Sequence, residues 1–273
     1  MFTVANRAFP PPMRIGFAGA GNMAAAMARG WAKLEEGEEP PAKSMAFADA
    51  GSGRAAQLAS EVEGEEVADV RALPQRSDVI VLTVKRTALD ELAGELEGDL
   101  PPLISVLAGV PLAQVQDAFP DTPVLRAMPN LAVEVRRGVT CYVPSDDGIG
   151  DEVEQALTSL LGHLGALCAI EDELIDAATA IMSSSPAYLA VFSQALVDAA
   201  QREGLNPKVA HSLVSETMAG TAELLHQRGT ESVRAAVASP GGATEAGLAA
   251  LAERDLEAAI HEAVRASMER MRR

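Results

Sequence analysis

Two short glycine-rich segments carry residue types that could bind anionic groups. The first, residues 19–24 (GAGNMA), fits the pattern G-x-G-x-x-A directly after an apolar run. The first glycine permits a tight turn, the second lets the backbone approach a pyrophosphate, and the small Ala24 suits close contact between helix and sheet. The pyrophosphate then lies at a helix N-terminus, where free N–H groups favour anions. The segment predicts a dinucleotide site, with a structural turn as the alternative.

Asp49 ends the next apolar run, where an acid that binds the ribose of a dinucleotide would lie. A carboxylate there favours NAD, because it accepts from the 2′-hydroxyl and repels a 2′-phosphate. Ser52 and Arg54 follow closely and could hold that phosphate instead. The preference between NADH and NADPH therefore stays open.

The second segment, residues 239–244 (SPGGAT), precedes a helical pattern. Adjacent glycines beside a helix start expose several N–H groups, which can bind a carboxylate, and Thr244 adds a hydroxyl. The alternative is a simple helix cap made by Thr244. A third segment, Ser183-Ser184-Ser185-Pro186, interrupts a helical pattern, and Pro186 suits the first turn of a new helix capped by Ser184 or Ser185.

The sequence offers few candidates for an acid catalyst and none for a metal site. The four histidines lie in helical patterns among charged residues and are interpreted as surface residues, and Lys208 is the only lysine after Lys85. A hydroxy-acid dehydrogenase needs a proton-transfer group beside the carbonyl, whereas a protonated imine is already electrophilic. Cys141 and Cys168 show no metal-ligand spacing and are interpreted as small core residues.

The first half of the chain alternates strand and helix patterns, which must position the first segment. Strands are expected at 14–17, 44–48, 78–84, 103–107, 124–126, 139–143 and 166–170, with helices between them. This alternation predicts a parallel sheet with helical crossovers, the α/β Rossmann class. The domain is expected to span residues 13–169.

Residues 170–273 show helical patterns without strands and are expected to form an all-α domain. One apolar stripe runs from Leu248 to Met271, and a second from Val209 to Leu225. So many apolar helix faces are hard to bury within about a hundred residues. Association with a second copy is therefore expected.

Composition excludes several classes of partner. The net charge of −17 disfavours nucleic acid and anionic membranes. Residues 1–12 lack the apolar core of a signal peptide, and no run of about 18 apolar residues predicts a membrane span. The expected location is the cytoplasm, and no nucleic acid or membrane partner is expected.

Several motifs together resemble the pyrroline-5-carboxylate reductase family. They are IGFAGAGNMAAAMARG at 15–30, TVKR at 83–86, SVLAGVPL at 105–112 and RAMPN at 126–130. In the second half, residues 183–200 and 239–251 are similar to that family's most diagnostic stretches. The resemblance covers nearly everything from Met13 to Met271, in order and spacing.

The resemblance implies a Rossmann domain followed by an all-α dimerisation domain, and an NADPH-dependent reduction of a cyclic imine, with NADH not excluded. It implies a homodimer through the helical domain, with a higher oligomer of dimers open. The implied catalytic residue is Thr244, which would hydrogen-bond the ring nitrogen. Substrate-binding residues would be Ser239, Gly241, Gly242, Ala243 and Thr244. Cofactor-binding residues would be Gly19, Ala20, Gly21, Asn22, Met23, Asp49, Val84, Lys85, Ala108, Gly109, Met128, Pro129 and Asn130.

The sequence departs from the family pattern at four places, namely Arg86, Leu131-Ala132, Ser183–Ser185 and Glu245. A six-membered ring substrate stays open, because one methylene is weakly discriminated. Two alternative functions also stay open. One is a β-hydroxyacid dehydrogenase-like enzyme, and the other is a dinucleotide-binding regulatory protein without activity.

Overall fold

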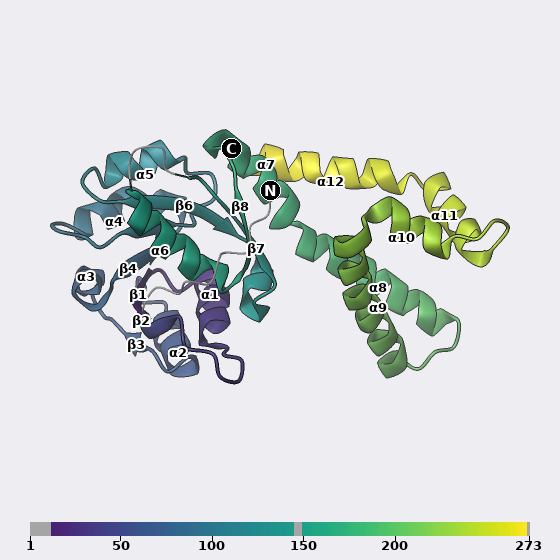
Figure 1. Ribbon diagram of the computed structural model, residues 1–273, viewed down its shortest axis with the longest axis horizontal. Coiled ribbons are helices and arrows are strands. Elements are labelled where there is room, and N and C mark those ends of the chain that lie inside the picture. Colours follow the sequence, from purple (N-terminus) through teal and green to yellow (C-terminus); the bar gives the residue numbers. More distant parts are fainter. Residues whose placement is uncertain (1–11, 145–148, 272–273) are drawn as a thin grey trace. The chain divides into compact units, whose positions relative to one another are not determined.

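The computed structural model describes residues 12–144 and 149–271, which form two compact units. The first reaches Ser183 and the second spans Ser184–Arg270 (Figure 1). The predicted boundary at residues 169 and 170 would give α7 (Ile175–Met182) to the helical domain. The structure instead packs α7 on the sheet, because Ile175 is fully buried beside Met128 and Cys141. The predicted N-terminal extension lies outside the described residues except for Pro12.

The first unit is built on an eight-stranded sheet in the order β3-β2-β1-β4-β5-β6-β7-β8. The order from β3 to β6 is the one typical of dinucleotide-binding sheets, with the switch point between β1 and β4. The strands are β1 Met13–Ala18, β2 Ala42–Ala48, β3 Glu65–Glu66, β4 Val79–Leu82, β5 Leu103–Ser105, β6 Val124–Pro129, β7 Gly138–Tyr142 and β8 Gly165–Ala169.

Helices cover both faces of this sheet, and alternation along the strands explains why. Ile15 and Phe17 of β1 and Val81 of β4 pack with α1, α2 and α6, whereas Ile80 and Leu82 pack with α3, α4 and α5. The helices are α1 Asn22–Ala32, α2 Arg54–Glu61, α3 Leu73–Arg76, α4 Leu89–Glu95, α5 Leu112–Ala118 and α6 Asp151–Gly162. Short 3-10 segments are η1 Val70–Ala72, η2 Arg86–Ala88, η3 Leu131–Val135 and η4 Asp172–Leu174.

The prediction of a parallel sheet is correct except for one pair. Strand β7 runs antiparallel to β6, with Met128 opposite Cys141, while β7 and β8 are parallel. The connection from Asn130 to Arg137 holds only η3, which is too short for the crossover that a parallel neighbour needs. Strand β3, η1 and α3 were not predicted, because each is only two to four residues long.

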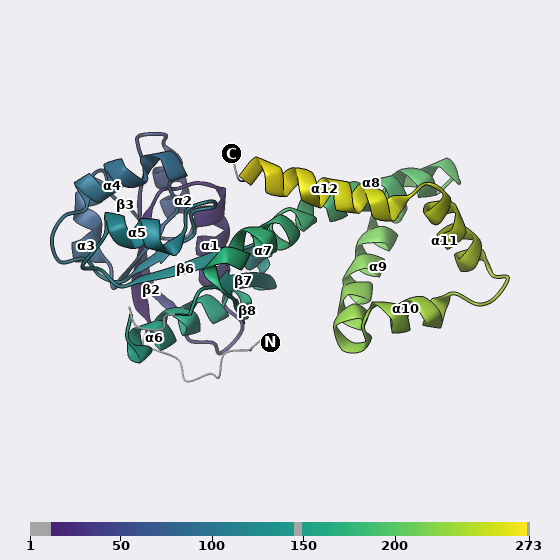
Figure 2. The same cartoon turned by 90° about the horizontal axis from the view of Figure 1, so that it is seen from above.

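The second unit consists of five helices (Figures 1 and 2). They are α8 Ser185–Arg202, α9 Pro207–Arg228, α10 Thr230–Val237, α11 Ala243–Glu253 and α12 Leu256–Met271. The sequence suggested a single helix for the apolar stripe from Leu248 to Met271, but the structure has two, α11 and α12. The chain breaks at Asp255, whose φ of 55° is left-handed and ends the helical path.

Apolar side chains of the helical unit remain exposed in the single chain. Val191 is 72% exposed, Val237 59%, Leu189 54% and Leu213 53%. By length and composition, one stretch of the described residues, Asp172–Arg202, is apolar enough to cross a membrane. The expectation of no such segment is therefore not confirmed. The same exposed side chains fit the expected association with a second copy.

Candidate active site

The predicted cofactor residues of the first unit gather at one edge of the sheet. Strands β1, β2, β4, β5 and β6 are parallel, so their carboxyl ends lie together. Gly19 follows β1, Asp49 follows β2, and Val84 follows β4. Ala108 and Gly109 follow β5, and Asn130 follows β6. Ligands of such sheets bind at this edge.

The turn after β1 has a shape that only glycine allows. Gly19 has a φ of 108°, and a Cβ atom built on it would lie 2.8 Å from the carbonyl carbon of Thr83. Gly21 is the N-cap of α1, and a Cβ there would meet only the Thr83 carbonyl oxygen at 4.0 Å. Open space therefore faces the N-terminus of α1, as a pyrophosphate requires. Ala24 is fully buried, as the small third position of the motif predicts.

Thr83 fixes this turn, although it was not predicted as a site residue. Its hydroxyl lies 2.8 Å from the Gly19 carbonyl oxygen and 3.1 Å from that of Ala18, and its N–H donates to Ala18 at 2.9 Å. A hydroxyl at the end of a buried apolar strand is the signal that could have indicated this role.

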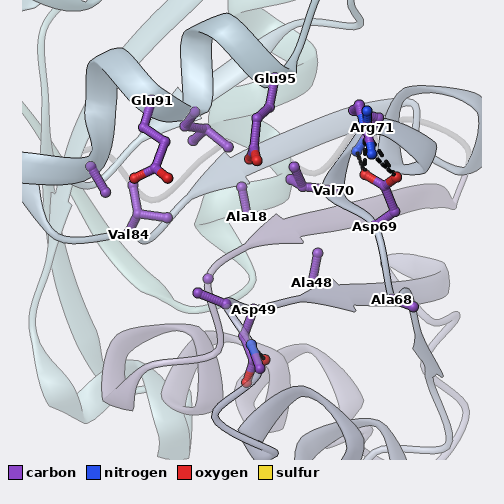
Figure 3. Close-up of a pocket in the computed structure, with 15 residues that line it drawn as sticks. Ala18, Ala48, Asp49, Ala68, Asp69, Val70, Arg71, Val84, Glu91 and Glu95 are labelled. Atoms are coloured by element: carbon purple, nitrogen blue, oxygen red, sulfur yellow. Dashed lines mark hydrogen bonds and ion pairs between the residues drawn. The ribbon is translucent and has the colours of Figure 1, made fainter.

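A cavity of about 490 Å³ lies beside the turn and brings together Gly19, Asp49 and Val84. Figure 3 shows Asp49 at the end of β2, with Glu91 and Glu95 of α4 also along the wall. Arg71 is turned toward Asp69, with 2.7 Å between Nη2 and Oδ2. Three predicted cofactor residues thus share one hollow that is large enough for a nucleoside.

The Asp49 carboxylate is already engaged within the β2–α2 turn. Oδ1 accepts from the N–H groups of Gly51 (2.8 Å) and Ser52 (3.1 Å). Oδ2 accepts from the Ser52 hydroxyl (2.6 Å) and the N–H of Ala55 (3.0 Å). Partial burial opposes ionisation, but these four hydrogen bonds outweigh it and lower the pKa of Asp49. All its lone pairs are used, so Asp49 shapes the turn.

A second hollow, of about 180 Å³, joins the glycine turn to Arg54. It is lined by Gly21 and Asn22 on one side and by Arg54 and Gln57 of α2 on the other. Arg29 also borders it, but its guanidinium is paired with Glu61, with 2.6 Å between Nε and Oε1. The hollow therefore has the size and the nearby cation suited to a phosphate group.

The remaining predicted cofactor residues differ in how they can act. Lys85 and Ala108 are exposed at the sheet edge, whereas Met128 and Pro129 are buried. Met128 packs with Cys141 and Ile175, and Met23 packs against the core, so these two would contribute backbone groups. Asn130 accepts from Val139 N–H at 3.0 Å and donates to the Met182 carbonyl at 3.2 Å. Its amide thus braces the end of α7.

The predicted substrate loop forms the entry to α11 in the second unit. Gly241 has a φ of 71°, and Gly242 is the N-cap. Gly242 N–H donates to the Ser239 carbonyl at 2.9 Å, and Gly241 N–H donates to Oε2 of Glu245 at 2.7 Å. Ala243 and Thr244 are exposed in the first helical turn. The N-cap is Gly242, which has no side chain, and Thr244 follows it in the first turn, so Thr244 is not at the N-cap as the helix-cap alternative expects.

The serine segment begins α8, as predicted, but Ser184 does not cap the helix with its side chain. Ser184 is the N-cap and Pro186 lies in the first turn, and the Ser184 side chain makes no cap hydrogen bond. The Ser184 hydroxyl lies 3.0 Å from that of Ser267 on α12, and the Tyr188 hydroxyl donates to Ala263 at 3.3 Å. The segment therefore ties α8 to α12.

The burial of the two cysteines agrees with their interpretation as small core residues. Cys141 is buried, Cys168 is half-buried, and both are free thiols. No group of three His, Cys, Asp or Glu side chains lies close enough to hold a metal within residues 12–144 and 149–271. His163 is an exception to the surface interpretation. It is half-buried, with Nδ1 3.0 Å from the Ser159 carbonyl oxygen, and burial lowers its pKa.

Comparisons with known proteins match both units. Residues 172–273 match a family model for pyrroline-5-carboxylate reductase dimerisation, and residues 14–109 match one for coenzyme F420-dependent NADP oxidoreductases. Pyrroline-5-carboxylate reductase of Synechocystis sp. is 36% identical, over 78% of this chain and 79% of its own length. Pyrroline-5-carboxylate reductase 2 of Bacillus subtilis is 33% identical over 90% of each chain.

Solved structures of proteins with the same name are also similar to this chain. The 1-pyrroline-5-carboxylate reductase of Streptococcus pyogenes has a TM-score of 0.84 at 25% identity, covering 96% of this chain and 98% of that one. The Plasmodium falciparum pyrroline carboxylate reductase with NADP bound has a TM-score of 0.79 at 23% identity, covering 95% and 97%. At 23% identity, the similarity to the Plasmodium falciparum structure shows a shared fold.

Proposed function

The chain belongs to the pyrroline-5-carboxylate reductase family, and on that premise we propose that it reduces the C=N bond of 1-pyrroline-5-carboxylate with NAD(P)H. The product is L-proline, so the reaction is the last step of proline biosynthesis. The observation that carries the proposal is the glycine turn at the carboxyl edge of the sheet, with open space at the N-terminus of α1. The nicotinamide supplies the hydride when it is bound.

In the first unit, the chain's task is to bind and orient the dinucleotide. The N–H groups of Asn22 and Met23 precede the first hydrogen bond of α1, which Ala25 donates to Gly21, and they would bind the pyrophosphate. The larger hollow would hold the adenosine half beside Gly19 and Val84. The sheet edge at Lys85, Ala108, Gly109 and Asn130 would then adjoin the nicotinamide half.

We propose that NADPH is preferred over NADH. Asp49 has no lone pair left for a ribose hydroxyl, because four donors of its own turn occupy both oxygens. Arg54 is exposed and borders the hollow beside Gly21, where its guanidinium can meet a phosphate. Arg54 is therefore available to bind a 2′-phosphate, whereas Asp49 is not available to bind a 2′-hydroxyl.

In the second unit, the loop at 239–244 would bind the substrate. The N–H groups of Ala243 and Thr244 precede the first hydrogen bond of α11, which Ala246 donates to Gly242, and they would receive the carboxylate. The Thr244 hydroxyl oxygen would accept a hydrogen bond from the N–H of the iminium and so orient the ring. Because the iminium is already electrophilic, this role does not require an acid of shifted pKa.

The helical unit makes the protein a homodimer, in agreement with the dimerisation model that it matches. We propose that the exposed apolar faces of α8 to α12 form the contact, and that a higher oligomer would be built from such dimers. A cytoplasmic location fits the free thiols Cys141 and Cys168. The acidic surface favours neither nucleic acid nor anionic membrane.

A substrate panel tests this proposal against its alternatives. Purified protein and NADPH are mixed with the five-membered carboxylated imine, its six-membered analogue or a β-hydroxy acid with NADP⁺, and absorbance of the nicotinamide is followed. The five-membered imine is expected to be turned over with the highest kcat/KM. Faster turnover of the hydroxy acid would reveal a dehydrogenase. Cofactor binding without any turnover would reveal a regulatory protein.

A further inference from the structure

The carboxylate of Glu245 occupies part of the loop that is proposed to receive the substrate carboxylate. Glu245 lies in the first turn of α11, and its Oε2 accepts from Gly241 N–H at 2.7 Å. A second N–H of the loop, that of Gly242, is engaged by the Ser239 carbonyl. Only Ala243, Thr244 and Glu245 itself then offer N–H groups that precede the first hydrogen bond of the helix.

Two features of Glu245 indicate that its contact can be exchanged. The side chain is exposed, so no surrounding packing holds it in place. Glu245 also forms no ion pair among the residues that the structure describes, so no cation neutralises it beside the loop. A charged acceptor on a backbone N–H is a contact that another carboxylate can replace.

We infer that Glu245 is a specificity-determining residue that competes with the substrate carboxylate for the loop; this inference rests on the proposed function. In the free enzyme its side chain holds Gly241 N–H. A carboxylated imine bound at the N–H groups of Ala243 and Thr244 places its carboxylate close to this second negative charge, and it must displace the Glu245 side chain to reach the Gly241 N–H as well. An imine without a carboxylate neither displaces the Glu245 side chain nor is repelled by its charge. Glu245 therefore weakens the binding of the carboxylated imine relative to an imine without a carboxylate.

A purely structural role makes a different prediction. Glu245 is at the position from which a side chain reaches back to cap its own helix. As a cap alone, Glu245→Ala would lower the free energy of unfolding and alter all substrates alike. Glu245→Gln keeps an oxygen acceptor for Gly241 N–H but removes the charge, so it separates capping from competition.

The test compares KM and kcat for 1-pyrroline-5-carboxylate and for 1-pyrroline, which lacks the carboxylate, at saturating NADPH. Glu245→Gln and Glu245→Ala are expected to lower KM for the carboxylated imine about threefold to tenfold. The KM for 1-pyrroline and both kcat values should change little. Glu253→Gln, at the far end of the same helix, removes an equal charge and should leave both KM values unchanged.

A second readout does not depend on turnover. Calorimetric binding of L-proline to the wild-type enzyme with NADP⁺ should tighten by a similar factor in Glu245→Gln. An active wild type whose two variants keep both KM values and the L-proline affinity overturns the inference alone. A KM that falls equally for both imines also overturns it, in favour of the cap. A wild type that reduces neither imine overturns the proposed function and the inference with it.

Discussion

At the scale of single residues, the proposal depends most on the hydroxyl of Thr244. Thr244→Ala removes the acceptor that would orient the iminium, so kcat for 1-pyrroline-5-carboxylate should fall about 10-fold to 100-fold. The NADPH dissociation constant should stay nearly constant, because Thr244 is not part of the glycine turn. Steady-state kinetics and fluorescence titration measure the two quantities. Thr244→Ser keeps a hydroxyl and should retain most activity, and unchanged kinetics in Thr244→Ala would contradict the role.

Arg54 carries the proposed preference for NADPH. Arg54→Gln should raise KM for NADPH about tenfold and leave KM for NADH nearly constant, because only NADPH has the 2′-phosphate. The matched control, Arg76→Gln, removes a cation of α3 that pairs with Glu65. Equal changes for both cofactors in Arg54→Gln would show that the arginine acts on the pyrophosphate instead.

Some residue roles were readable from the sequence and others were not. Gly19, Gly21 and Ala24 were predicted, because the motif itself states which positions need small residues. The four hydrogen bonds that Asp49 accepts were not predicted, because they depend on the backbone conformation of the β2–α2 turn. The role of Thr83 was missed because its acceptors, on Ala18 and Gly19, lie 65 and 64 residues away in sequence.

At the scale of elements, Thr83 joins the end of β4 to the turn between β1 and α1. Thr83→Val keeps the side-chain volume but removes the hydroxyl, which leaves two carbonyl oxygens without that donor. The free energy of unfolding should fall by about 1–2 kcal/mol, and the NADPH dissociation constant should rise. Urea denaturation and titration measure both. Thr87→Val, in the exposed segment beyond β4, is the control, and equal effects in both variants would refute the role.

An ion pair links the segment before β2 to the end of η3. Arg136 binds Glu38, and this contact, against the opposing effect of burial, lowers the pKa of Glu38 to about 2. Because the folded pKa is below the unfolded one of 4.5, the contribution is present above pH 4.5 and is lost as pH falls toward 2. Glu38→Gln should cost about 1–2 kcal/mol at pH 7, and this difference should shrink as the pH falls toward 2.

Urea unfolding at several pH values measures this difference. Glu39→Gln, an exposed neighbour in the same loop, should leave the stability unchanged at every pH. A constant gap between wild type and Glu38→Gln from pH 7 to pH 2.5 would contradict the linkage.

Element boundaries were predictable where the apolar pattern and the backbone agree. Strands β1, β2 and β4 were expected close to their observed limits, because each is buried between helices. The direction of β7 was not, since strand patterns carry no orientation. The break between α11 and α12 was also hidden, because the apolar stripe continues through Leu256 while Asp255 turns the backbone.

At the scale of the whole molecule, the exposed faces of the helical unit require a second copy. Val191 on α8 is 72% exposed, and Val191→Glu would place a charge within the apolar surface. The variant should shift the dimer toward the monomer at micromolar concentration, as measured by light scattering. Gln201→Glu adds the same charge near the end of α8 and should leave the dimer intact. A wild-type monomer would contradict the assembly.

Reduction of one C=N bond converts 1-pyrroline-5-carboxylate into proline, so product analysis is the most direct test of the proposed activity. Wild-type enzyme is incubated with 1-pyrroline-5-carboxylate and a limiting amount of NADPH, and the proline formed is quantified by chiral chromatography. One L-proline is expected for each NADPH consumed. Oxidation of NADPH without proline, or no oxidation although NADPH binds, would contradict it.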